Sequence, residues 1–250
     1  MEGKSVIITG ASRGIGAAAA REFAEQGAKV MLCARTADAC ADIAAEITEN
    51  GGQALSMGCD VADAKAMQAV VDATVAAFGG LDVFVANAGK LDPVARLEDL
   101  EPQDFAAVID INVNGVFYGI RAALPVMKAR GGGTFITVGS GAASSALEGW
   151  PHYCASKAAV HHLNACLHAE EAANGIRALV LSPGTVATEM QVIIGKSGVN
   201  PVSQLAWEDH IPPEWPAKAL AWMATPDADR WLGQVVSLRD ETVRQRAGLI

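Results

Sequence analysis

The chain has 250 residues, of which 51% are apolar and 19% charged, so it can fill a sizeable core and is not intrinsically disordered. Its 19 basic and 28 acidic residues give a formal net charge of −9, which disfavours nucleic acid and anionic membranes as partners. The five cysteines are irregularly spaced and predict neither a disulfide framework nor a zinc ribbon. Because no apolar run has the length of a membrane span and no signal-peptide pattern is present, we expect a cytoplasmic protein.

Short β-branched runs alternate with longer amphipathic or alanine-rich segments, a pattern typical of βαβ units. The runs predict seven strands, at residues 5–9, 29–34, 53–57, 81–86, 134–138, 177–181 and 234–238. Helices are expected between them, at about 14–26, 37–49, 64–78, 103–128, 153–174 and 214–224. The alternation predicts one α/β domain over residues 1–250, built on a doubly wound seven-stranded parallel sheet that binds its ligand at the carboxyl ends of the strands.

A glycine-rich turn follows the first expected strand, with the sequence Thr9-Gly10-Ala11-Ser12-Arg13-Gly14-Ile15-Gly16. Such a turn lets the backbone approach a diphosphate, whose charge meets the free amides and the positive dipole of the next helix. A plain glycine-rich turn is the alternative. The position between the first strand and the first helix favours the nucleotide site.

The end of the second strand indicates which nucleotide binds. Ala34 stands where an NAD site places an acid for the ribose 2′-hydroxyl, and Arg35 follows it. Arg13 supplies a second guanidinium, and paired arginines suit a phosphate dianion. The sequence therefore favours NADP(H) over NAD(H), with two solvated surface arginines as the alternative.

Two further loops are candidates for the adenosine. Asp60 and Val61 follow the third strand, and Asp60 can accept a hydrogen bond from an adenine amino group. Asn87-Ala88-Gly89 follows the fourth strand and can pass beneath the adenosine. The alternative for each loop is a turn with no role in binding.

Tyr153 and Lys157 are four residues apart on an expected helix, so they share one face. A free phenol has a pKa near 10 and is a poor base at neutral pH. A cation about 4 Å away, at an effective dielectric of about 20, lowers that pKa by roughly three units before desolvation is subtracted. We therefore expect Lys157 to bring Tyr153 into the working range of an acid/base catalyst.

Two polar residues are expected near this pair. Ser140 ends the fifth strand, so its hydroxyl can point into the same cleft and hold a substrate oxygen. Asn112 is an amide within an apolar helical stretch, and a buried amide needs partners. Asn112 is then either a residue that staples the helix or part of a polar relay through water to Lys157.

Taken in order, these motifs resemble those of the short-chain dehydrogenase/reductase family, over residues 5 to about 238. The resemblance implies a Rossmann-type fold and an oxidoreductase that passes hydride between NADP(H) and a ketone or secondary alcohol, of the carbonyl or 3-oxoacyl reductase type. It implies that Tyr153 exchanges a proton with the substrate oxygen and that Ser140 polarises it. Lys157 would lower the Tyr153 pKa and bind the nicotinamide ribose, and Asn112 would anchor a relay water. Pro183, Gly184, Val186 and Thr188 would flank the nicotinamide.

The resemblance also implies a small-molecule carbonyl or alcohol as substrate and a homodimer or homotetramer. Two departures limit it. Many relatives have an Asp-Gly-Gly turn after the last strand, whereas this chain has Arg239 and a charged tail over 239–250, which puts the common tetramer contact in doubt. The irregular segment 187–213, with Trp207, is the expected substrate lid and leaves the substrate open.

Other functions are weighed against this one. His162 and Cys166, near His161 and His168, have i,i+4 spacing that suits a metal, but such helical histidines are more typical of surfaces or interfaces, and we expect no metal. Ser140 with His152 lacks the nucleophile-elbow pattern of a hydrolase. An NAD(H)-dependent alcohol, sugar or steroid dehydrogenase and a nucleotide-sensing protein without catalysis remain as alternatives. Pro125 predicts a kink or a helix end.

Overall fold

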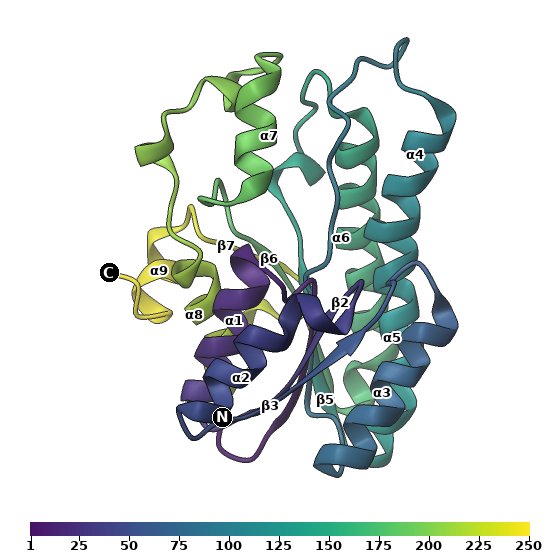
Figure 1. Cartoon of the computed structure of the whole chain (residues 1–250), viewed down its shortest axis with the longest axis vertical. Coiled ribbons are helices and arrows are strands. Elements are labelled where there is room, and N and C mark those ends of the chain that lie inside the picture. The colour runs from purple at the N-terminus through teal and green to yellow at the C-terminus, as the bar shows by residue number, and fades with distance from the viewer.

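Seven parallel strands form the central sheet, in the spatial order β3-β2-β1-β4-β5-β6-β7. The computed structural model describes residues 1–250 and is drawn in Figure 1. The strands are β1 (Ser5–Thr9), β2 (Lys29–Ala34), β3 (Gln53–Gly58), β4 (Val83–Ala86), β5 (Gly133–Val138), β6 (Ile176–Ser182) and β7 (Val235–Ser237). This order confirms the predicted doubly wound parallel sheet of Rossmann type. Its two halves meet at β1 and β4, where such sheets bind ligands.

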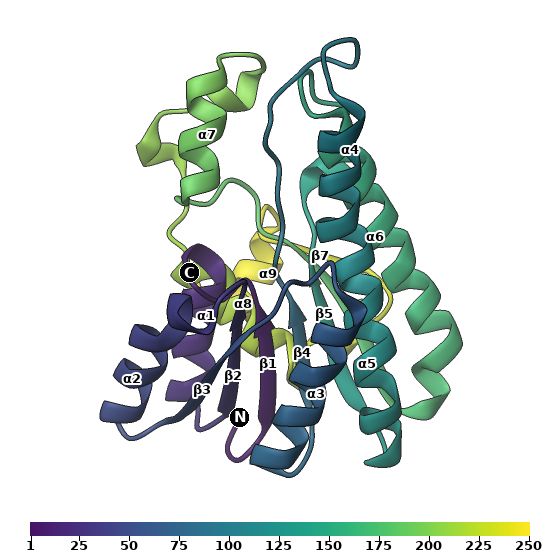
Figure 2. The same cartoon turned by 45° about the vertical axis from the view of Figure 1, so that its right-hand side comes forward.

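Helices cover both faces of the sheet (Figures 1 and 2). One face carries α1 (Gly14–Glu25), α2 (Ala41–Glu49) and α8 (Glu214–Met223), and the other carries α3 (Ala64–Phe78), α4 (Pro102–Ile109), α5 (Gly115–Ala129) and α6 (Pro151–Glu171). Successive strand residues point to opposite faces. Val6 and Ile8 of β1 therefore join the core under α1, whereas Ile7 joins the core under α3 and α5.

Local signals explain most helix ends, with one exception. Asp63 caps α3 by accepting a hydrogen bond from the N–H of Lys65 at 2.8 Å, and α3 ends at Gly79 in the left-handed conformation. The single helix expected at 103–128 is divided, because Asp110–Asn114 form a π-helical turn between α4 and α5. An apolar period gives no signal for the residue that such a turn inserts. Pro125 does not end its helix, since α5 continues to Ala129.

The segment 187–213, which we call the lid, is more regular than expected. It contains α7 (Glu189–Ser197) and two 3₁₀ turns, Pro201–Gln204 and Trp207–Asp209. Figure 2 shows α7 standing beyond the carboxyl ends of the strands, apart from the helices that cover the sheet. The two ends of the lid are joined, because the N–H of Ala187 donates to the carbonyl of Ile211 at 2.9 Å and the N–H of Ile211 donates to that of Thr185 at 3.0 Å.

The charged tail after β7 is also regular and packs on the core under α1. It forms α9 (Glu241–Arg246), in which Val243 is 1% exposed within the α1 core. The guanidinium of Arg246 lies 5.9 Å from the centre of the Trp231 ring. None of the helices is both long enough and apolar enough to cross a lipid bilayer.

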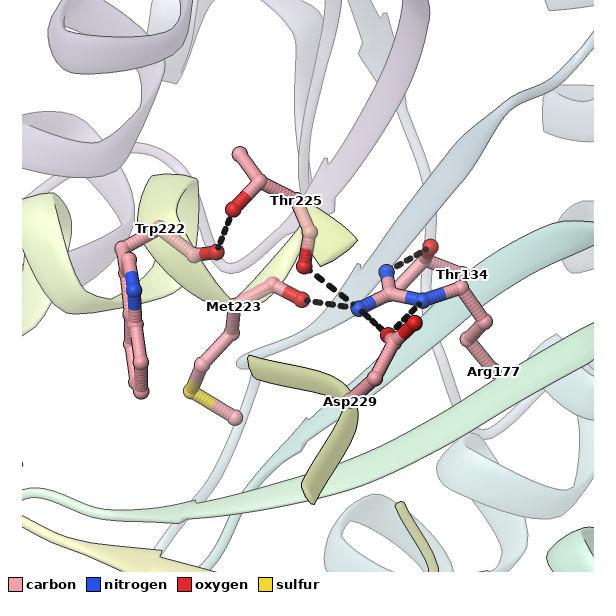
Figure 3. Close-up of polar contacts among 6 residues, drawn as sticks. All are labelled: Thr134, Arg177, Trp222, Met223, Thr225 and Asp229. Carbon is pink, nitrogen blue, oxygen red and sulfur yellow. Dashed lines mark hydrogen bonds and ion pairs between the residues drawn. The ribbon is translucent and has the colours of Figure 1, made fainter. Parts of the chain in front are cut away.

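Arg177, near the amino end of β6, joins the sheet to the end of α8 (Figure 3). Its Nε donates to Asp229 at 2.8 Å and its Nη1 to the hydroxyl of Thr134, on β5, at 2.8 Å. Its Nη2 donates to the backbone carbonyl of Met223, the last residue of α8, at 3.3 Å, and to that of Thr225 at 2.6 Å, which also accepts from the N–H of Ala228. One guanidinium thus satisfies groups from three segments, at the edge of the sheet opposite the lid.

Candidate active site

A cleft of about 1880 Å³ runs along the carboxyl ends of the strands and beneath the lid. Its wall holds all but two of the residues predicted to bind the cofactor or carry the chemistry: Gly10, Ser12, Arg13, Gly14, Ile15, Arg35, Asp60, Val61, Asn87, Ala88, Gly89, Ser140, Tyr153, Lys157, Pro183, Gly184, Val186 and Thr188. The other two lie behind the wall. Gly16 packs against Gly10, and Asn112 is 1% exposed next to Gly89.

Two positions of the loop between β1 and α1 require glycine. Gly10 has a φ of +65°, and a Cβ there would lie 2.9 Å from the Cα of Ala88. A Cβ on Gly16 would overlap the carbonyl oxygen of Gly10. The first turn of α1 therefore packs tightly under the loop, and no side chain caps it, because Arg13 at the N-cap makes no capping hydrogen bond. Its free amides and helix dipole suit a diphosphate.

Asn87 joins the end of β4 to this glycine-rich loop. Its Nδ2 donates to the carbonyls of Thr9 at 2.9 Å and Gly10 at 3.1 Å. In return the hydroxyl of Thr9 accepts hydrogen bonds from the N–H groups of Asn87 and Ala88, each at 3.1 Å. The Asn87 side chain thus braces the loop, and Ala88 and Gly89 are left to form the wall of the cleft beside it.

The two arginines predicted to select NADP(H) both line the cleft, and one of them has a partner. Arg35 is exposed at the end of β2. The side chain of Arg13 is 70% exposed and forms an ion pair with Glu189, the first residue of α7. This ion pair joins the glycine-rich loop to the lid. Asp60 is exposed in the cleft wall, where its Oδ1 accepts a hydrogen bond from the backbone two residues further on, at 3.0 Å.

Tyr153 and Lys157 lie together on the first two turns of α6, as their spacing predicted. The Nζ of Lys157 lies 5.5 Å from the centre of the Tyr153 ring and donates to the carbonyl of Val138 at 2.9 Å. Both residues are less than a tenth exposed. Burial raises the pKa of Tyr153 to about 12, with the neighbouring Ser140 hydroxyl acting against the rise, and burial lowers the pKa of Lys157 to about 8.

The expected lowering of the Tyr153 pKa by Lys157 is therefore wrong for this structure. The spacing placed a cation near the ring, but the cost of taking a phenolate out of water sets the pKa of Tyr153, and the group that lowers this pKa is the Ser140 hydroxyl and not Lys157. Tyr153 is protonated at neutral pH, in the form that donates a proton.

Ser140 follows β5 and reaches the same part of the cleft. Its Oγ accepts a hydrogen bond from the N–H of Ala142 at 3.1 Å, and its own N–H donates to Nε2 of His161 at 3.3 Å. Burial, aided by the charge of Lys157, lowers the pKa of His161 to about 4. The imidazole is thus neutral at physiological pH and can accept this bond.

Asn112 lies in the π-helical turn with its amide fully engaged. Its Oδ1 accepts from the N–H of Lys90 at 2.8 Å, and its Nδ2 donates to the carbonyl of Lys90 at 2.8 Å and to the hydroxyl of Ser156 at 2.9 Å. A Cβ on Gly89 would lie 3.4 Å from Oδ1 of Asn112 and 3.7 Å from Nζ of Lys157. The amide and the ammonium therefore flank Gly89, and the contacts of the amide are those of a stapling residue.

The expectation that His161, like its neighbours His162, His168 and Cys166, belongs to a surface or an interface is wrong, because His161 lines the cleft. His162 and Cys166 are exposed, and no three potential metal ligands gather anywhere in the chain. His161 is one turn beyond Lys157, and that second i,i+4 step placed it on the face of α6 that carries the site.

Two apolar residues of the cleft were not predicted at all. Trp150 packs edge to face on Tyr153, with 5.8 Å between the ring centres. Ile194 of the lid is 1% exposed in the same cluster. The cluster that contains both joins the lid to the start of α6, which lie far apart in the chain, so no local pattern reports it.

Comparison with known proteins identifies the family. The family model for short chain dehydrogenase matches residues 4–197. The chain belongs to the short-chain dehydrogenase/reductase family. This dehydrogenase/reductase is 38% identical over 193 residues to D-threitol dehydrogenase of Mycolicibacterium smegmatis, covering 76% of the chain and 73% of the relative. It is 34% identical over 238 residues to cis-4-hydroxycyclohexanecarboxylate dehydrogenase of Sinomonas cyclohexanicum, covering 93% of each.

A solved structure agrees with this assignment. A 7α-hydroxysteroid dehydrogenase in complex with NADH and 7-oxoglycochenodeoxycholic acid matches with a TM-score of 0.86 at 30% identity, over 95% of this chain and 93% of that one. The predicted family is confirmed. The dehydrogenase/reductase is an oxidoreductase that acts on alcohols or ketones with a nicotinamide cofactor.

Proposed function

We propose that this dehydrogenase/reductase transfers hydride between NADP(H) and a ketone or secondary alcohol, as a reductase of the carbonyl or 3-oxoacyl type. The observation that carries the proposal is that Tyr153, Ser140 and Lys157 meet in the same cleft as the glycine-rich loop. A phenol beside a hydroxyl is the pair needed to bind a carbonyl oxygen and to protonate it. The nicotinamide, when bound, supplies the hydride.

Each side chain near the substrate oxygen has a separate role. Tyr153 donates the proton, and its pKa of about 12 keeps that proton in place at neutral pH. Ser140 holds the substrate oxygen by a hydrogen bond. Lys157, protonated below its pKa of about 8, would bind the nicotinamide ribose. Asn112 holds the Lys90 backbone beside it.

The rest of the cleft would hold the cofactor. The loop and first turn of α1 would hold the diphosphate, and Arg13 and Arg35 would hold the 2′-phosphate. Loops at the strand ends would supply the other contacts: Asp60, Val61, Asn87, Ala88 and Gly89 for the adenosine, and Pro183, Gly184, Val186 and Thr188 for the nicotinamide.

The catalytic assignment is tested by Tyr153→Phe, assayed against a panel of ketones with NADPH. We expect the rate to fall by about 10³-fold, within the usual contribution of a general acid, with the affinity for NADPH retained. Tyr118→Phe is the matched control, because Tyr118 is the only other tyrosine and does not line the cleft. Activity that survives in Tyr153→Phe would contradict the mechanism.

The cofactor assignment is tested by the affinities of the enzyme for NADPH and NADH. NADPH should bind more tightly, and Arg35→Asp should narrow or reverse the difference, because a carboxylate repels the 2′-phosphate and accepts from a 2′-hydroxyl. Arg121→Asp makes the same charge change outside the cleft. Equal affinities in the unchanged enzyme would contradict the assignment.

A specific observation favours the main alternative, an NAD(H)-dependent dehydrogenase. The guanidinium of Arg13 already pairs with Glu189, so only Arg35 is left without a carboxylate partner. The steroid dehydrogenase matched above was solved with NADH. Tighter binding of NADH would support this alternative, and tight nucleotide binding without turnover across the panel would instead support a nucleotide-sensing protein.

We also propose that the enzyme is a cytoplasmic homodimer or homotetramer. All five cysteines are free, which suits a reducing compartment. Large apolar side chains are exposed on and before α4 and α5, namely Leu97, Phe105 and Phe117. We expect an interface between copies of the chain to cover them. Sedimentation of the enzyme should show an oligomer that Phe117→Asp dissociates.

A further inference from the structure

We infer that the substrate carries its carbonyl or hydroxyl group on an apolar carbon frame and is not a polyol. The inference rests on the proposed reductase function and adds the class of substrate. It starts from an apolar cluster around the reacting residue that is separate from the two cores of the sheet. The buried members of this cluster are Leu91, Ala142, Trp150, Tyr153 and Ile194.

Three segments that are distant in sequence build the cluster. Leu91 follows β4, Ala142 and Trp150 lie between β5 and α6, and Ile194 belongs to α7 of the lid. The half-buried Leu147, Met190 and Val202 extend it. Seven apolar members line the cleft, and we call them the apolar chamber: Leu91, Ala142, Leu147, Trp150, Met190, Ile194 and Val202. Tyr153 therefore acts against hydrocarbon walls.

The lid is held against the other wall of the apolar chamber at its far end as well as at its base. Asn200 is 5% exposed, and its Nδ2 donates to the carbonyl of Glu148, before α6, at 2.9 Å. Beside it, a Cβ on Gly149 would lie 3.0 Å from the side chain of Val199. The walls contact one another across the cleft, so the lid side chains of the chamber are placed to contact the substrate.

The charged side chains that flank the chamber are paired with one another. Lys90 lies 3.6 Å from Asp92, and Arg13 pairs with Glu189. Ser144 and Ser145 are exposed at the rim. Within the cleft two polar atoms have no partner, Oε1 of Gln191 and Nε1 of Trp150. Beyond Tyr153 and Ser140, this arrangement can serve two further polar groups of a substrate but not a series of hydroxyls.

The physical consequence is a preference between substrate frames. Each hydroxyl of a polyol that enters the apolar chamber gives up hydrogen bonds to water that these walls do not replace. Each methylene that enters the chamber is transferred from water to an apolar environment, which is favourable. One such group typically raises kcat/KM by about 10-fold or more. For a compound with several groups of either kind, the discrimination multiplies.

The test compares two ketones with the unchanged enzyme and NADPH. Decalone is a bicyclic hydrocarbon ketone, and erythrulose is a small ketone with three hydroxyls. We expect kcat/KM for decalone to exceed that for erythrulose by at least about 100-fold. Equal or better use of erythrulose would overturn the substrate class and leave the reductase function standing.

Variants of the lid test whether the apolar chamber causes the preference for decalone over erythrulose. Ile194→Asn and, at a less buried position, Met190→Gln place an amide in the apolar chamber, and each should reduce the decalone to erythrulose ratio by about 10-fold. Val192→Asn is the matched control, because Val192 lies on the same helix, is 42% exposed and does not line the cleft. A ratio that neither lid variant alters would overturn the inference.

Binding separates this inference from the proposed function. Calorimetry of Tyr153→Phe with NADPH bound should show heat of binding for decalone and none for erythrulose. If the unchanged enzyme reduces no ketone and decalone still binds selectively, the reductase function fails and the substrate class stands. If decalone does not bind, the substrate class fails.

Discussion

The backbone N–H of Ser140 donates a hydrogen bond to Nε2 of His161 across 3.3 Å, from the end of β5 to the third turn of α6. One turn earlier on α6, Lys157 donates to the carbonyl of Val138 at 2.9 Å. Between these two contacts lies Gly139, where a Cβ would overlap the His161 ring. Helix α6, which carries Tyr153, therefore fixes the position of the strand end that carries Ser140.

We predict that His161→Leu lowers kcat for ketone reduction by about 10-fold to 100-fold, because a shift of about 1 Å in Ser140 is enough for such a loss. The affinity for NADPH should not change. His162→Leu is the control, since the adjacent His162 is exposed.

A double-variant cycle shows whether the effect passes through Ser140. In a Ser140→Ala background, His161→Leu should cost little more activity. If the fold-losses of activity of the two single variants multiply fully in the double variant, His161 does not act through Ser140.

How much the sequence predicts depends on how far apart the interacting residues lie. The bounds of β1 and β2 match the predicted runs to the residue, because turn residues flank each buried apolar run. Tyr153 and Lys157 were paired correctly because both lie on one helix. The contact of His161 with Ser140 and the cluster that includes Ile194 and Trp150 join different segments, and no periodicity reports them.

The prediction of the Tyr153 pKa was wrong for the same reason, because it depends on segments that are distant in sequence. The spacing on α6 gives the distance to the Lys157 charge, but the burial of the phenol depends on the lid and on the loops after β4 and β5, which the sequence did not place. The π-helical turn at Asn112 was missed because one inserted residue leaves the apolar pattern on both sides intact.

The buried Lys157 makes stability depend on pH. Burial lowers its pKa from 10.5 to about 8, so the folded enzyme loses this proton at lower pH than the unfolded chain. Below about pH 8 both states are protonated and the folded state bears the cost of the buried charge. As pH rises from about 8 to 10.5 that cost is relieved, because the unfolded chain then holds more protons, and stability rises.

We therefore predict that the stability of Lys157→Met relative to the unchanged enzyme declines by about 2 kcal/mol between pH 7 and pH 9.5, at about 1.4 kcal/mol for each pH unit above 8. Urea unfolding at several pH values measures this. Lys218→Met, which removes an exposed ammonium from α8, supplies the baseline. If the stability of Lys157→Met relative to the unchanged enzyme rose with pH, the predicted sign would be wrong.

Removing the carboxylate that pairs with Arg13 should change the choice of cofactor. Glu189→Gln frees the Arg13 guanidinium for a 2′-phosphate, so we predict that the affinity for NADPH rises by about 3-fold to 10-fold while that for NADH stays constant. The gain should shrink in high salt, because both partners are exposed.

The control for this change is Glu208→Gln, which removes an exposed negative charge elsewhere on the lid. Equal gains for NADPH and NADH in Glu189→Gln would mean that the ion pair with Arg13 does not limit phosphate binding.

The contacts of Arg177 predict a loss of stability without a loss of function. Arg177→Met leaves the carbonyl of Met223, at the end of α8, without its donor and removes one of the two donors to the carbonyl of Thr225, so we expect the free energy of unfolding to fall by about 2–3 kcal/mol. Because Arg177 lies near the amino end of β6, opposite the cleft, kcat/KM at low temperature should be unchanged. Lys128→Met breaks an ion pair with Glu171 in which the lysine is 41% exposed, and it should cost no more than about 1 kcal/mol. Equal losses in urea unfolding of the two variants would show that the shared contacts of Arg177 add nothing beyond one surface charge pair.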